Sequence, residues 1–204
     1  MFKSIKEEVV GEITEKKSKF ICHLYPVDSV EEAEDKIINL RKKYHDARHN
    51  CFAYRIYKDG IERSSDDGEP SGTAGAPMLA ILNGNNLSNC LAVVTRYFGG
   101  ILLGTGGLVR AYQDALNDAL GKAEIVDVEL GKEAIFEVDY NQFEELKYIL
   151  KNMEVNVAKV SYGEKVEVTV IGPEEKIETL KQNNFSERVK LTNFSFLGER
   201  YYYL

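Results

Sequence analysis

"RYFGGILLGTGGLVRAY", residues 96–112, packs five glycines and two arginines between an apolar run and a helix-like pattern. The apolar run before it, "CLAVVTRYF" (90–98), is too continuous in apolar residues to be half exposed, and it predicts a buried strand. After Gly107 the apolar residues recur at helical spacing and predict the inner face of a helix: Leu108, Tyr112, Ala115, Leu116 and Ala119. The stretch is therefore expected to be a strand-to-helix junction.

The glycines and arginines of this junction have the chemistry of an anion-binding site. Glycine lets backbone N–H groups approach a ligand, a helix start offers unpaired N–H donors, and arginine adds forked donors. The candidate residues for binding an anion or RNA phosphate are Arg96, Gly99, Gly100, Gly104, Gly106, Gly107 and Arg110. The alternative is that the glycines only permit a sharp turn and close packing. Neither a P-loop nor a G-x-G-x-x-G spacing is present, so a nucleotide triphosphatase is not expected.

A polar loop, "SSDDGEPSGTAGAP" (64–77), supplies a second group of candidates next to this face. Its residues of interest, with His49 from the preceding segment, are His49, Asp66, Asp67, Glu69, Ser71, Gly72 and Thr73. The carboxylates have the oxygen ligands that magnesium prefers, but the same composition is typical of a surface turn, which we favour. His49 and Cys51 alternate along a strand, yet no third partner completes a catalytic set. We therefore assign no catalytic residue, metal or cofactor.

The chain changes in character after Gly121, where the glycine-rich loops end. Alternating and helical apolar patterns then predict strand 131–140, helix 142–151, strands 154–162 and 165–171, helix 173–183 and strand 188–203. This β-α-β-β-α-β order is ferredoxin-like. We predict two domains, residues 1–128 and 129–204. Within the first, a hairpin is expected to turn at residues 58–60.

Composition limits the classes of partner. The net charge is −7, from 26 basic and 33 acidic residues, so nucleic acid could be contacted only through a local basic patch. No apolar run reaches the length of about 18 residues that a membrane helix needs, and the charged start does not resemble a secretory signal. We expect a cytoplasmic protein without a membrane partner. The three cysteines show no C-x-x-C and are expected to be reduced.

Three segments of the first domain resemble the IMPACT family, in its bacterial YigZ-like branch: "HNCFAYRI", "DDGEPSGTAG" and "GTGGLVRAY". The intervening pattern of glycines, aliphatic residues and the "RYFGG" of residues 96–100 also matches. The resemblance covers essentially the full chain. It implies an α+β protein of two domains: an α/β sandwich similar to domain IV of elongation factor G, and a ferredoxin-like domain similar to domain V.

The same resemblance implies a role in translation. Eukaryotic IMPACT proteins restrain a starvation-responsive kinase of translation initiation, using an extra N-terminal recruitment module that we do not expect here. The transferable expectation is a noncatalytic regulator that binds RNA or the ribosome through its glycine- and arginine-rich face, with Tyr97, Phe98 and Tyr112 as candidate stacking side chains. Two alternatives stay open: an enzyme acting on a small phosphorylated or carboxylated ligand, and a protein-interaction module in a stress response. Whether Arg96 is exposed or buried against an acid is also open.

Overall fold

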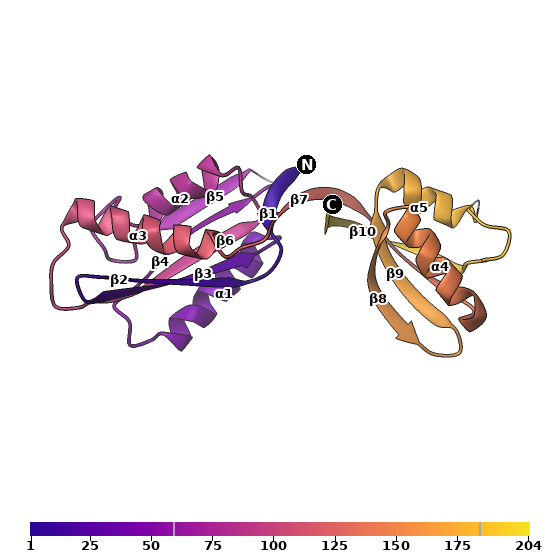
Figure 1. The fold of residues 1–204 in the computed structure, drawn as a ribbon, viewed down its shortest axis with the longest axis horizontal. Helices are drawn as coiled ribbons and strands as arrows, with labels where there is room; N and C mark the ends of the chain where they lie inside the picture. The colour runs from indigo at the N-terminus through magenta and orange to yellow at the C-terminus, as the bar shows by residue number, and fades with distance from the viewer. Residues whose placement is uncertain (59, 184) are drawn as a thin grey trace. The chain divides into compact units, whose positions relative to one another are not determined.

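A computed structural model describes residues 1–58, 60–183 and 185–204. Packing divides the chain into two units, Phe2–Asp127 and Val128–Leu204, which are described separately below. Each unit joins a sheet to helices (Figure 1), which confirms the predicted two-domain α+β class. Among the described residues, no helix has both the length and the apolar character needed to cross a membrane.

The first unit is built on an antiparallel sheet with the order β2-β3-β6-β4-β5. The strands in that order are Val9–Glu15, Ser18–Pro26, Cys90–Tyr97, His49–Ile56 and Ile61–Ser65, and a short β1 covers Phe2–Ile5. Strand β6, formed by the apolar run of residues 90–98, occupies the centre and is buried along almost its whole length. The expectation of a buried strand is confirmed, because both of its faces are covered.

Helices lie on both faces of this sheet (Figure 1). Helix α1 (Val30–Lys43) packs on one face with Leu91 and Val93 of β6. Helices α2 (Gly75–Gly84) and α3 (Thr105–Leu120) pack on the other face with Ala92 and Val94. Successive β6 side chains therefore enter different cores, as the two-residue period of a strand requires. The inner face predicted for α3 is confirmed, since Leu108, Tyr112, Ala115, Leu116 and Ala119 are all buried.

The hairpin predicted from residues 51–64 is present as β4 paired with β5. Ile56 lies opposite Ile61, so the strands are antiparallel and adjacent. Of the predicted turn, Asp59 lies outside the described residues.

The second unit has the predicted ferredoxin-like order of elements. These are β7 (Ile125–Val138), α4 (Tyr140–Asn152), β8 (Asn156–Tyr162), β9 (Val166–Gly172), α5 (Glu174–Lys181) and β10 (Thr192–Tyr203). Strands β8, β9, β7 and β10 pair in that order, each antiparallel to its neighbour. One face packs its apolar side chains with α4 and α5. The other face of the two central strands carries Glu133, Ile135, Glu137, Glu167, Thr169 and Ile171.

The composition of this second face bears on nucleic-acid binding. An RNA-binding sheet stacks bases on aromatic side chains. The two central strands, both wholly described, present no aromatic side chain there and carry three glutamates instead. This face therefore lacks the stacking side chains of an RNA-binding sheet.

Candidate functional site

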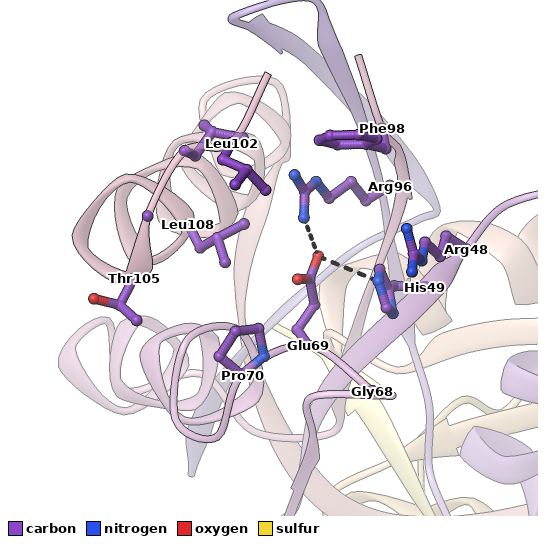
Figure 2. Close-up of a pocket in the computed structure, with 12 residues that line it drawn as sticks. Arg48, His49, Gly68, Glu69, Pro70, Arg96, Phe98, Leu102, Thr105 and Leu108 are labelled. Atoms are coloured by element: carbon purple, nitrogen blue, oxygen red, sulfur yellow. Dashed lines mark hydrogen bonds and ion pairs between the residues drawn. The ribbon is translucent and has the colours of Figure 1, made fainter. Parts of the chain in front are cut away.

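A cavity of about 420 Å³ lies in the first unit, where the end of β6, the start of α3 and the loop after β5 meet. Figure 2 shows its lining side chains, which come from segments far apart in the sequence. The residues used below are Arg48, His49, Glu69, Arg96, Phe98, Leu102, Gly104, Thr105 and Leu108. The volume lies within the range typical of small-molecule pockets.

Arg96 stands at the end of β6 and is buried, with 6% of its surface exposed. Its Nη1 donates to Glu69 Oε1 at 2.6 Å. The guanidinium carbon lies 5.4 Å from the ring centre of Phe20 and 5.6 Å from that of Phe98. Its Nε has no hydrogen-bond partner among the described residues. The question left open by the sequence is answered: Arg96 is buried against an acid and is not part of an exposed basic face.

Glu69 is the centre of a small buried network. Its Oε1 accepts hydrogen bonds from Arg96 and, at 2.9 Å, from the Tyr112 hydroxyl of α3. His49 Nε2 lies 3.9 Å from the same oxygen. Burial, followed by the neighbouring Cys51 and Glu69, raises the pKa of Tyr112, so its hydroxyl stays protonated and donates. The second carboxylate oxygen, Oε2, accepts no hydrogen bond from the described residues.

Cys51 lies below this network on β4. Its thiol is buried, and its single S–H lies within hydrogen-bond distance of the Asp66 carbonyl (2.9 Å) and the Tyr112 hydroxyl (3.3 Å). Burial is the main cause that raises the pKa of this thiol, so the reactive thiolate is disfavoured. The His49 ring turns its Nδ1 to the Asp67 carbonyl at 2.8 Å. The geometry therefore does not support a Cys–His nucleophile, although both residues lie in this region.

Asp66 and Asp67 fold the loop and do not line the cavity. The Asp66 carboxylate accepts the backbone N–H groups of Gly72, Ala74 and Gly75 at 2.8–2.9 Å and thereby caps α2, whose own N-cap residue has no side-chain bond. The Asp67 carboxylate accepts two hydrogen bonds of 2.7 Å, one from the backbone N–H of Asn50 and one from the Arg41 guanidinium. No group of three or more ligating side chains in the described residues could hold a metal ion.

The other loop candidates also point elsewhere. Thr73 donates its hydroxyl to the Pro70 carbonyl, Gly72 donates to Asp66, and Ser71 is exposed. Of the seven loop-group residues, the structure brings only His49 and Glu69 to the cavity.

Removing the Asp66 cap is expected to destabilise the first unit. Asp66→Ala should cost about 2 kcal/mol near neutral pH, because three N–H groups lose a charged acceptor. Burial alone would raise the pKa of Asp66, but the three backbone bonds outweigh it and hold the pKa below the ordinary value of 3.8. A group with a depressed folded-state pKa stabilises above its unfolded value, and this contribution is lost as pH falls through the folded value.

Urea unfolding from pH 7 down to about pH 3 measures both effects. The wild type should lose stability below about pH 4 more steeply than Asp66→Ala. The matched control is Asp114→Ala on the exposed side of α3, expected to change stability by no more than about 0.5 kcal/mol. Equal pH profiles for the wild type and Asp66→Ala would contradict the capping role.

The glycines of the junction divide into two kinds. A Cβ at Gly99 would overlap the backbone of Lys17 in the β2–β3 turn, so this glycine serves close packing. Gly104 takes a positive φ of 71° as the N-cap of α3 and makes no side-chain cap bond. Beside it, Gly106 has no heavy atom within 4 Å of the place where a Cβ would be. Beside the cavity, the first backbone N–H groups of α3 are therefore neither capped nor covered by a side chain.

Arg110 and Arg48 are two exposed cations of this region. Arg110 lies on the outer side of α3, as predicted, but does not line the cavity. Arg48 does line it, and the sequence reasoning missed it. Neither forms an ion pair with any residue that the structure describes. The signal that could have pointed to Arg48 is its position directly before β4, beside His49.

Comparisons with known proteins cover both units. Residues 16–120 match the family described as the Impact N-terminal domain, and residues 136–183 match a domain of unknown function, DUF1949. IMPACT family member YvyE of Bacillus subtilis is 40% identical over 93% of this chain and 86% of its own length. IMPACT family member YigZ of Escherichia coli is 39% identical over 83% of each chain. A solved structure of a hypothetical protein aligns with a TM-score of 0.65 at 35% identity, covering 94% of this chain and 96% of its own.

Proposed function

Because this chain belongs to the IMPACT family, in its YigZ-like branch, we propose that it is a noncatalytic, translation-associated regulator of the cytoplasm that binds RNA or the ribosome. The proposed contact is the glycine- and arginine-rich face of the first unit, at the rim of the cavity. This moves the cationic contact from Arg96, which is buried, to the rim residues around it.

The observation that carries the proposal is the bare start of α3 together with two unpaired arginines. The first N–H groups of a helix point outward and carry its positive dipole end, which favours phosphate. Arg110 lies one helical turn after Gly106 and Gly107, on the exposed side of α3. Arg48 adds a cation at the cavity. A local patch of this kind is compatible with the net charge of −7.

Two alternatives each have a supporting observation. His49, Glu69 and Arg96 line a single cavity and meet near Glu69 Oε1, as an enzyme acting on a small phosphorylated ligand would require. A protein-docking role is supported by the exposed apolar side chains of Ile101 and Leu102 near the rim. We favour the noncatalytic function, because Oε1 of Glu69 is already bonded to Arg96 and Tyr112.

Co-sedimentation with bacterial ribosomes tests the proposal. We expect the wild type to sediment at low salt and to be released as salt rises, because phosphate contacts displace counterions. The double variant Arg48→Ala/Arg110→Ala should bind more weakly, with a slope of log affinity against log salt that is lower by about two. Arg188→Ala, an exposed arginine of the second unit, is the matched control for lost charge.

Two results would count against the proposal. A double variant that sediments like the wild type would remove this face as the contact. No sedimentation at either salt would remove direct ribosome binding and favour a small phosphorylated ligand.

A further inference from the structure

The Arg96–Glu69 pair inside the cavity is only half satisfied. Nη1 of Arg96 and Oε1 of Glu69 bond to each other, but Arg96 Nε has no partner and Glu69 Oε2 accepts no bond from the described residues. Both side chains are at least nine-tenths buried. Buried polar groups are rarely left without partners, since each such group costs about 1–3 kcal/mol. Arg96 Nε is therefore a buried donor without a partner, and Glu69 Oε2 is an acceptor that no described residue uses.

The cavity has one apolar and one polar wall. Figure 2 shows Leu108 across the space from Arg96 and Glu69, and Leu102 also lines the cavity. Phe98 lies over the guanidinium and is 43% exposed, so part of its ring is open to a ligand. A flat group with apolar faces and a polar edge would match this arrangement.

We infer that the cavity receives a single unstacked nucleobase of an RNA strand, whose edge accepts a hydrogen bond from Arg96 and donates one to Glu69. This inference rests on the proposed function and names the ligand chemistry of the same site. Single-stranded RNA is commonly recognised in this way, with splayed bases stacked on side chains and bonded along their Watson–Crick edges. Each of the four RNA bases carries an acceptor next to an N–H donor on that edge. A strand of any sequence can therefore supply the matching base edge.

The rim distinguishes an RNA strand from a peptide amide, which has the same pairing of donor and acceptor. The bare start of α3 and the unpaired Arg48 border the cavity, and both favour phosphate. A nucleotide joins a base to a phosphate, so it would use the cavity and its rim together.

The test is fluorescence anisotropy with two labelled chains of equal charge. One is a uridine hexanucleotide; the other carries the same phosphates on abasic spacers. The wild type should bind the uridine chain at least about fivefold more tightly, because each stacked base contributes about 1–3 kcal/mol. Free UMP and inorganic phosphate are the competing ligands, and both should compete much more weakly than the uridine chain.

Three variants separate the base from the phosphates. Leu102→Ser should weaken binding of the uridine chain about fivefold and leave the abasic chain unchanged; it is expected to fold, since Leu102 is 83% exposed. Arg48→Ala should weaken both chains by a similar factor. Leu197→Ser, at an exposed leucine of the second unit, is the matched control and should change neither.

Each contrary result has a definite meaning. Equal affinity of the wild type for both chains would overturn base insertion while leaving the phosphate contacts of the proposed function in place. UMP competing as well as the hexanucleotide would overturn the RNA strand as the source and assign the site to a free nucleotide. Binding of neither chain would overturn the inference, and ribosome co-sedimentation would then show whether the proposed function fails with it.

Discussion

Glu69→Ala is expected to lower the free energy of unfolding of the first unit by about 3–5 kcal/mol. The variant would leave the Arg96 guanidinium buried without its anion, and the Tyr112 hydroxyl would lose its acceptor. A single unpaired buried charge is among the most destabilising defects a point mutation can create. Urea unfolding followed by tyrosine fluorescence measures the change, since the chain has 12 tyrosines and no tryptophan.

The control for this prediction is an exposed ion pair of the same unit. Glu124 bonds Lys6 at 2.9 Å, with both side chains at least half exposed. Glu124→Ala should therefore change stability by less than about 1 kcal/mol. A similar loss for the two variants would show that the burial of the Arg96–Glu69 pair has no energetic consequence.

A triple apolar variant tests whether the Arg96–Glu69 pair is needed for folding or for recognition. Buried ion pairs can often be replaced by apolar groups of similar volume with little loss of stability. Glu69→Leu, Arg96→Met and Tyr112→Phe together should recover most of the stability lost by Glu69→Ala. If the triple variant folds stably but no longer prefers uridine over abasic chains, the pair is needed for recognition and not for folding.

Local patterns predicted the scaffold well, because the core of each unit follows the helical and strand periods. β6 and α3 could be read from residues 90–119, since their apolar spacing matches their burial. In the second unit the element order was right, but β7 begins at Ile125 rather than near residue 131. Its first half does alternate, since Asp127 and Glu129 separate Val126, Val128 and Leu130, but the predicted domain boundary at residue 128 cut through it.

The site itself was only partly predictable. Arg96 was identified, but its burial depends on Glu69, which is 27 positions away in a loop without periodicity. The neighbouring acids look alike in sequence, yet Asp66 turns to backbone N–H groups while Glu69 turns to the cavity. Their different directions follow from tertiary contacts. The sequence does not distinguish Leu102 from the apolar residues beside it, and only the fold shows that it is exposed at a cavity.

The second large effect is expected at Gly99, between β6 and the cavity. A Cβ at Gly99 would lie 2.0 Å from the carbonyl carbon of Lys17 and 2.3 Å from the nitrogen of Ser18. Because both are backbone atoms, the overlap with the added Cβ cannot be relieved by rotating a side chain. The turn that carries them is also constrained, because Lys16 and Lys17 both take positive φ angles. Gly99→Ala should therefore cost about 3 kcal/mol or more, at the upper end of the range for overpacking.

Gly106→Ala is the matched comparison within the same junction. Its Cβ would meet no heavy atom within 4 Å, and alanine favours a helix over glycine by about 0.5–1 kcal/mol. Urea unfolding should thus give opposite signs for the same substitution seven positions apart. Equal effects would mean that close approach to the β2–β3 turn does not explain Gly99. Opposite signs would show that Gly99 is required for close packing of the junction against the β2–β3 turn, while Gly106 is under no such steric constraint.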